Sequence, residues 1–274
     1  MREEVHLALI VIVGSLLAVA LWEFCQSRRQ REFPALRRRL GNLGIWLLNI
    51  VLAGFTFASL DTFRPQFEGT FGVALPSWPL AEQWLSLVVA FLLLDFLHYA
   101  AHRCQHAVPW LWRFHALHHS DPDLDVTTSV RHHPIEYLIT AGFYWLAVLT
   151  LGIPLIVVTS HALAVFTAAA ITHGNIRVPE WLDRALQPAV ITLDLHLIHH
   201  SIVDEQANAN FGAVLSIWDR IFGTYLRLSR AEQARLVFGV RELAPADALK
   251  PSVMIMTPWL LRRAAVERVA GSAE

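Results

Sequence analysis

Apolar residues in this chain are gathered into five long runs. The runs cover about residues 5–23, 45–60, 80–98, 135–151 and 155–172. Each approaches the length that a helix needs to cross the hydrocarbon core of a bilayer, although the second is short. Only the turn Gly152-Ile153-Pro154 separates the last two runs, which either cross separately or form a hairpin that enters one leaflet. The pattern predicts an all-α, polytopic membrane helical bundle with about four to five membrane segments.

Composition agrees with a membrane protein. Hydrophobic residues make up 55% of the chain and charged residues only 16%, against about 25% charged in a typical soluble domain. The first run could be mistaken for a signal peptide, but its leading residues Met-Arg-Glu-Glu lack the positive charge of such peptides, so we interpret it as an anchor. Without repeats or long linkers, residues 1–274 are expected to form a single integral-membrane domain.

Arginines predict the orientation of the bundle. Six lie between the first two runs, namely Arg28, Arg29, Arg31, Arg37, Arg38 and Arg39, whereas the outer loop expected at 61–79 carries only Arg64. The positive-inside rule places the arginine-rich loop in the cytoplasm. Counting crossings from there brings the chain near His98 and all of residues 173–274 to the same side, as a cytoplasmic helical cap.

The overall charge and residue usage narrow the setting further. Arginine outnumbers lysine by 21 to 1, which is typical of a GC-rich bacterial genome and suggests the bacterial inner membrane. The net charge of −1 and the absence of a nucleic-acid motif predict no nucleic-acid partner. The two cysteines provide neither a disulfide framework nor a Cys-x2-Cys metal knuckle.

Histidines are concentrated where the chain is expected to reach the cytoplasm. Thirteen of the fourteen lie between His98 and His200. They include the groups His98-x3-His102, His115-x2-His118-His119 and His196-x2-His199-His200, with His173 between the last two. Residues three and four apart share one face of a helix, so each group can direct its imidazoles to one point. Nine metal ligands, His98, His102, His115, His118, His119, His173, His196, His199 and His200, are too many for one ion and predict a two-metal site.

The ligand type indicates the metal. Structural zinc sites close with four ligands and usually include cysteine, and haem requires only one or two axial histidines. The chain has no His-Glu-x-x-His signature and no pair of Glu-x-x-His motifs of the kind used by soluble carboxylate-bridged di-iron bundles. Two non-haem Fe ions bound almost wholly by imidazole account best for the ligand count, and such a positive pair should favour an oxygen-derived oxidant.

Several polar residues near these groups have open roles. His106, His132 and His133 fall outside the repeated spacing and are either supporting groups or part of a substrate pocket, while a lone His161 is more often a structural hydrogen-bonding residue. Asp95 and Asp194 lie close to His98 and His196 and are expected to fix ligand tautomers. We expect three further aspartates to be solvated loop residues and helix N-caps, namely Asp121, Asp123 and Asp125.

The spaced motifs resemble the fatty acid hydroxylase superfamily, also called the sterol desaturase family. The resemblance spans residues 80–228 and rests on Asp95-Phe-Leu-His98-Tyr-Ala-Ala-His102-Arg, Leu111-Trp-Arg-Phe-His115-Ala-Leu-His118-His119-Ser, Thr172-His173-Gly-Asn175, His196-Leu-Ile-His199-His200-Ser, Asn210-Phe211-Gly212 and Trp218-Asp219-Arg220-Ile-Phe222-Gly223-Thr224-Tyr225. Arg131, His133, Pro134 and Glu136 are similar to the family's Arg-x-His-Pro-x-Glu element.

The resemblance implies an integral-membrane di-iron oxygenase that hydroxylates or desaturates a lipid. It also implies that the nine histidines are the ligands and that electrons come from cytochrome b5 or a ferredoxin. Because no haem-type module accompanies the core, the donor is expected to be a separate protein. The expected substrates are fatty acyl, sphingoid, ether-lipid or carotenoid molecules rather than sterols.

Two other classes remain as alternatives. One is a membrane dizinc hydrolase, although the carboxylate ligands usual in such sites are absent. The other is a non-catalytic metal-binding protein, either a transporter or a degenerate relative. A transporter should carry ligands through the depth of the bilayer, whereas these gather at one face, and degeneracy should break a histidine group, whereas none is broken.

Overall fold

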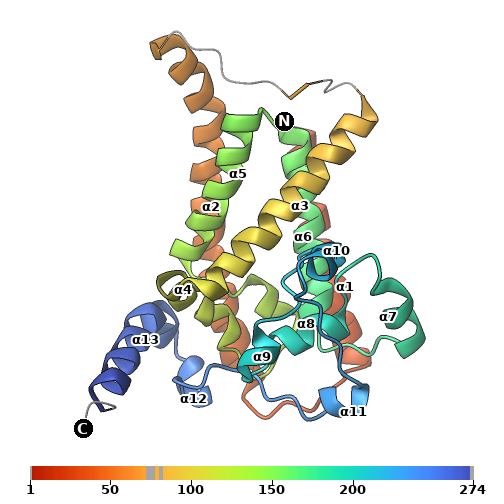
Figure 1. The fold of residues 1–274 in the computed structure, drawn as a ribbon, viewed down its shortest axis with the longest axis vertical. Helices are drawn as coiled ribbons and strands as arrows, with labels where there is room; N and C mark the ends of the chain where they lie inside the picture. Colours follow the sequence, from red (N-terminus) through yellow and green to blue (C-terminus); the bar gives the residue numbers. More distant parts are fainter. Residues whose placement is uncertain (1, 72–77, 80–82, 272–274) are drawn as a thin grey trace.

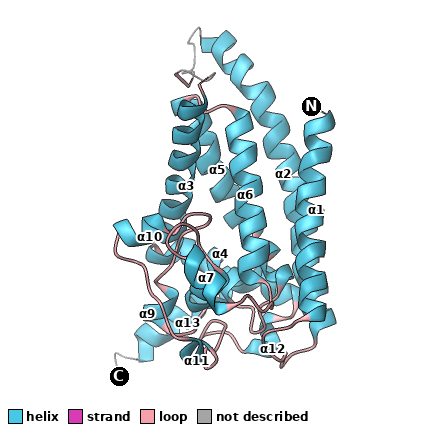
Figure 2. Ribbon diagram, turned by 90° about the vertical axis from the view of Figure 1, so that its right-hand side faces the viewer, coloured by secondary structure: helices cyan, strands magenta, loops and turns pink. Residues whose placement is uncertain are grey.

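Five long apolar helices form a bundle, and the other described helices lie at one end of it (Figures 1 and 2). The structure is a computed structural model that describes residues 2–71, 78–79 and 83–271. The bundle consists of α1 (Arg2–Cys25), α2 (Ala35–Phe71), α3 (Trp84–Ala107), α5 (Pro134–Leu151) and α6 (Leu155–His173). Each contains a stretch of at least 18 residues that is long and apolar enough to cross a membrane. Only 11–28% of each stretch is buried, which leaves broad apolar faces for lipid.

The chain runs back and forth, so its cap lies at one end. Helix α1 descends from the end marked N in Figure 1, α2 returns, and α3 descends again to α4 (Pro109–His119). The cap also contains η1 (Val126–Val130), α7 (Glu180–Leu186), α8 (Leu193–His199), α9 (Asp204–Ala207), α10 (Ile217–Ile221), α11 (Arg230–Gln233), α12 (Pro245–Ala248) and α13 (Pro251–Gly271). The described residues contain isolated β-bridges but no strand, in agreement with the expected all-α class.

Helix α2 is longer than its apolar run. It begins at Ala35, so Arg37, Arg38 and Arg39 lie on a helix rather than in the expected loop. At its other end it continues to Phe71, into the segment expected as an outer loop; residues 72–77 and 80–82 of that segment lie outside the described residues. Hydropathy reports the depth of a segment in a membrane, and a helix can extend beyond that depth at both ends.

Small side chains let the bundle helices pack closely. Ala90 and Leu94 on α3 meet Ala147 and Val148 on α5, and Val157 on α6 joins the same cluster. Ala90 is 0% exposed and Ala147 is 2% exposed. In a bilayer, such small interfacial residues allow close backbone approach, which gains van der Waals contact where the hydrophobic effect gives little.

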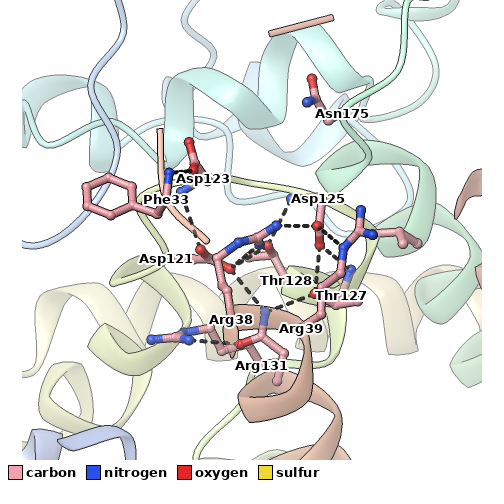
Figure 3. A network of polar contacts seen from close by, with 12 residues as sticks. Phe33, Arg38, Arg39, Asp121, Asp123, Asp125, Thr127, Thr128, Arg131 and Asn175 are labelled. Atoms are coloured by element: carbon pink, nitrogen blue, oxygen red, sulfur yellow. Dashed lines mark hydrogen bonds and ion pairs between the residues drawn. The ribbon is translucent and has the colours of Figure 1, made fainter. Parts of the chain in front are cut away.

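A buried ionic network connects α2 to the cap (Figure 3). Arg38 donates to Asp121 at 3.0 Å and to Asp125, and all three side chains are fully buried. Arg39 adds a 2.8 Å hydrogen bond to Asp125. Asp125 is the N-cap of η1, as expected, because its side chain accepts from the backbone of Thr127. The expected solvation of Asp121 and Asp125 is wrong, since each carboxylate is sequestered by a cation that the sequence places more than 80 residues away.

Arg131 extends this network to the far side of the cap. Its guanidinium donates to the carbonyls of Leu117 and Ala248 at 2.9 and 2.7 Å, and to the side chains of Asn42 and Ser120, each at 2.8 Å. One buried side chain thereby joins α2, the end of α4 and α12. This structural role accounts for the arginine of the Arg-x-His-Pro-x-Glu element.

Candidate metal centre

Nine histidines from four helices converge into two groups. The first contains His102, His106, His115, His119 and His199, and the second contains His118, His173, His196 and His200. Within each group the candidate ligand nitrogens lie within 4.8 Å of one another. Helices α3 and α6 each serve one group, whereas α4 and α8, the latter with the residue that caps it, contribute to both. Histidines four residues apart share a group, whereas those three apart, such as His115 and His118, are divided between the two groups. The expectation that each sequence cluster directs its imidazoles to one point is therefore wrong, because residues three and four apart lie on opposite sides of the same helix face.

Nitrogen–nitrogen distances within the groups suit ligands of a common ion. In the first group, Nε2 of His102 lies 3.0 Å from that of His199 and 3.1 Å from that of His115. In the second, Nε2 of His173 lies 3.0 Å from those of His118, His196 and His200. Two nitrogens bound at right angles to one metal at about 2.1 Å would be separated by about 3.0 Å.

Hydrogen bonds on the opposite ring nitrogens determine which atoms are free in the first group. Nδ1 of His102 faces the carbonyl of Phe211 at 2.8 Å, and Nδ1 of His199 faces that of Ala209 at 2.8 Å. A carbonyl only accepts, so each Nδ1 carries the hydrogen and each neutral ring has a bare Nε2. Nδ1 of His115 is held in the same way by the Glu136 carboxylate at 2.8 Å. Three bare nitrogens therefore point at one another, an arrangement that suits a cation between them.

The second group leads to the same conclusion. Nδ1 of His173 donates to the carbonyl of Ala169 at 2.7 Å, which leaves its Nε2 bare. That atom can accept only one good hydrogen bond from its three neighbouring rings. The Nδ1 atoms of His118, His196 and His200 are buried, and no described residue hydrogen-bonds to them. A metal ion would engage all four Nε2 atoms together.

Burial keeps the rings in the form that binds metal. Desolvation lowers the pKa values of His118, His119, His196 and His200 well below the usual range, and neighbouring imidazoles lower them further. Burial likewise lowers the pKa of His199 to about 3. At neutral pH these rings are uncharged, and neutral imidazole is the metal-binding form.

His98 lies apart from both groups, and His106 lies within the first. Nδ1 of His98 faces the Tyr144 hydroxyl at 3.2 Å, whereas the His106 ring lies 4.7 Å from the rings of both His119 and His199. The spacing His-x3-His occurs twice on α3, because His106 also follows His102 by four residues. The geometry separates the two pairs: α4 begins directly after α3 ends, so its histidines lie beside the last turn of α3.

The remaining polar residues have varied partners. His132 stacks on His118 with ring centroids 4.4 Å apart and shares Glu136 with His115. Burial alone would lower the pKa of His132, but the Glu136 carboxylate outweighs it and raises the pKa. His133 caps α5 by accepting from the backbone of Ile135. Glu136 is thus a supporting carboxylate, a role that its sequence position alone did not reveal.

Neither aspartate expected to fix a ligand tautomer bonds directly to one of the nine rings. Asp194 pairs with Arg28 at 2.5 Å and Arg230 at 3.2 Å. Asp95 accepts from His161 at 3.2 Å and from the Trp218 indole at 2.8 Å. Backbone carbonyls orient three of the rings instead, those of His102, His173 and His199, and a sequence pattern of side chains cannot identify them.

Asp219 holds the loop that supplies two of these carbonyls. Its carboxylate accepts from the backbone of Phe211 at 2.7 Å and of Gly212 at 2.9 Å. Asn210 adopts φ 57° and bonds to the backbone of Leu195 and Leu226. A Cβ at Gly212 would lie 2.5 Å from the carbonyl oxygen of Leu215, so glycine is required there. The Asn-Phe-Gly motif and Asp219 therefore serve the metal centre indirectly, through His102 and His199.

Comparisons with known proteins agree with this architecture. The fatty acid hydroxylase family model matches residues 87–224. The chain is 35% identical to the ornithine lipid hydroxylase OlsE of Rhizobium tropici over 54% of this chain and 43% of that protein. It is 29% identical to the human alkylglycerol monooxygenase over 64% of this chain and 36% of that protein, and 28% identical to the human cholesterol 25-hydroxylase over half of each. The chain thus spans half or less of the length of these relatives. No solved structure matches it. On the family match and the geometry together, the chain belongs to the fatty acid hydroxylase family.

Proposed function

We propose that the chain is a membrane-bound non-haem di-iron oxygenase that hydroxylates or desaturates a C–H bond of a lipid. The observation that carries this proposal is the pair of imidazole groups, each with bare Nε2 atoms about 3 Å apart. The proposed ligands are His102, His106, His115, His119 and His199 for one ion, and His118, His173, His196 and His200 for the other. His106 thus replaces His98 in the ligand set expected from spacing.

A lipid substrate follows from the setting of the centre. The metal groups lie at the cap end of a bundle whose outer faces are apolar, so a substrate dissolved in the bilayer reaches them by moving laterally between helices. The three relatives described above carry names of enzymes that oxidise ornithine lipid, alkylglycerol and cholesterol. We extend to this chain the class that these names share, a lipid, and not an individual compound.

The iron pair would supply the activation of O2 and the oxidation of the C–H bond. The chain holds the ligands in place and excludes water. The Phe211 and Ala209 carbonyls fix the rings of His102 and His199, and Glu136 fixes His115. Glu136 also bonds to Nδ1 of His132 at 2.9 Å. This pair can hold a proton beside the centre while the proposed ligand rings stay neutral.

Electrons would arrive from the side opposite the bundle. A cavity of about 170 Å³ in the cap reaches His173, and Arg28, Arg29 and Arg31 line it. These arginines belong to the positive segment that the positive-inside rule assigns to the cytoplasm. We therefore propose that the metal centre faces the cytoplasm of a bacterial inner membrane and accepts electrons from a separate acidic protein of the cytochrome b5 or ferredoxin type.

Metal content tests the proposal most directly. Protein purified from iron-supplemented cells should contain about two irons per chain. His106→Ala should lower this content, while His98→Ala, the same change two turns earlier on α3, should leave it unchanged. The iron-loaded protein should consume O2 in the presence of a lipid and a reductant. A well-folded protein that binds no metal, or an iron-loaded protein that oxidises none of a panel of lipids, would refute the oxygenase.

A further inference from the structure

A series of hydrogen bonds crosses the bundle farther from the cap ends of α3 and α6 than the metal groups. It joins Asp95 and His98 on α3, Tyr144 on α5 and His161 on α6. At about 1.5 Å per residue, His98 lies about 13 Å from the cap end of α3, Tyr144 about 15 Å from that of α5, and Asp95 about 18 Å from that of α3. Polar residues within membrane-spanning helices are costly, so four of them joined by hydrogen bonds point to a functional role. None of the four belongs to either metal group.

The donor and acceptor roles in this series of hydrogen bonds follow from Asp95 at its buried end. Oδ2 of Asp95 accepts from the Trp218 indole at 2.8 Å and from the backbone of Leu215 at 3.2 Å, and both of these groups only donate. Asp95 is therefore an accepting carboxylate, and its Oδ1 receives the Nε2 hydrogen of His161 at 3.2 Å. A carboxylate fixes the imidazole of a Ser-His-Asp triad in the same way.

The hydrogen bonds of Asp95 determine which group donates in each of the following hydrogen bonds. With its hydrogen on Nε2, a neutral His161 has a bare Nδ1, which accepts the hydroxyl hydrogen of Tyr144 at 2.9 Å. The Tyr144 oxygen then accepts from Nδ1–H of His98 at 3.2 Å. The outcome is a neutral His98 whose Nε2 is a hydrogen-bond acceptor. No described residue hydrogen-bonds to this Nε2, and His98 is half-buried.

We infer that His98 Nε2 is the point that recognises the substrate, by accepting a hydrogen bond from a hydroxyl or amide N–H of the lipid. His98 lies four residues before the proposed ligand His102, a rise of about 6 Å along one face of α3. A lipid held at His98 would therefore present carbons a few bonds from its O–H or N–H to the metal centre. This inference rests on the proposed function and names the substrate class of the same site.

Fixing the tautomer of His98 makes the site selective for lipids that donate a hydrogen bond. A bare nitrogen repels the lone pairs of an ether, ester or ketone oxygen and attracts only donors. A lipid without a hydrogen-bond donor binds less well to such a site, because the buried acceptor nitrogen is then left unpaired. Asp95, His161 and Tyr144 are positioning residues in this arrangement, since they act on the substrate only through His98.

Paired lipids test the inference on the iron-loaded protein in nanodiscs. The probes are a long-chain secondary amide with its N-methylated tertiary counterpart, and a fatty alcohol with its methyl ether. Binding is measured by competition with a fluorescent fatty acid, and oxidation is measured by product analysis. We expect the donor member of each pair to bind and react about tenfold better in the wild type. In His98→Leu the preference should fall to about one while the iron content is unchanged.

Two further variants separate recognition from folding. His98→Gln, whose amide oxygen can take the place of Nε2, should keep part of the preference. Tyr144→Phe releases the tautomer of His98 and should weaken the preference, whereas Tyr137→Phe, the same change elsewhere on α5, should not. Equal binding of donor and acceptor lipids by the wild type, a preference for the acceptors, or an unaltered preference in His98→Leu would overturn the inference. If such a protein still oxidises lipids, the proposed function stands and only the role of His98 fails. If the wild type oxidises none, the proposed function has failed.

Discussion

Replacing Arg38 by leucine should strongly destabilise the protein, because it breaks the buried contact between α2 and the cap. Arg38 is fully buried between Asp121 and Asp125, which are also fully buried. Asp125 would keep Arg39 at 2.8 Å, but Asp121 would retain only uncharged donors such as Asn42 and Thr128. Breaking a buried pair from one side leaves an uncompensated charge, which typically costs about 3–5 kcal/mol. We expect a decrease of that size in the free energy of unfolding.

Reversible unfolding in mixed micelles measures this decrease, and the neighbouring arginine provides the control. Arg37 is exposed on the same turn of α2, so Arg37→Leu should change the free energy of unfolding by no more than about 0.5 kcal/mol. The double variant Arg38→Leu/Asp121→Leu should recover part of the loss, because it removes the stranded anion. If Arg38→Leu proves as stable as Arg37→Leu, the network of Figure 3 does not connect α2 to the cap as argued here.

Three other perturbations test the centre and its supports. Glu136→Gln should weaken metal binding about 10–100-fold in a chelator competition, because His115 loses the carboxylate that holds its Nδ1; an unchanged affinity would contradict that role. The metal-free protein should lose stability as the pH falls below about 6.5. His199 then binds a proton in the unfolded chain but stays neutral in the folded protein, where burial lowers its pKa to about 3. The cost is about 1.4 kcal/mol per pH unit for this residue alone, so a thermal midpoint that is equal at pH 7.5 and 5.5 would count against it. Gly212→Ala should lower both the thermal midpoint and the iron content, because its Cβ would displace the loop that orients His102 and His199; an iron content like that of the wild type would argue against this coupling.

Periodicity and charge were sufficient for the bundle but not for its polar interior. The five spans and the gathering of the histidines at one end follow from hydropathy, which depends only on local composition. The choice between His98 and His106 does not, because both lie four residues from His102 and a helix alone treats them alike. That choice depends on where α4 packs. In the same way, Asp121 resembles a solvated loop residue until Arg38 is brought to it from the start of α2.

Sequence analysis also could not predict which backbone carbonyls orient the histidine rings. The rings of His102, His173 and His199 are oriented by backbone oxygens, which every residue possesses. Side-chain patterns therefore predict the ligands better than the groups that align them. Asp219 and Asn210 belong to recognisable motifs, but their part in the centre becomes clear only when the loop they hold is seen beside α8.

The sharing of α4 and α8 between the two groups has a consequence for how the protein is made. Both groups are incomplete until the segment from His196 to His200 has been synthesised, and all five membrane-spanning helices precede that segment in the chain. All five of these helices are therefore synthesised, and available for insertion, before either histidine group is complete. Metal loading is then a late step of assembly, and a nascent chain that stalls before α8 would have a bundle in the membrane but no centre to load.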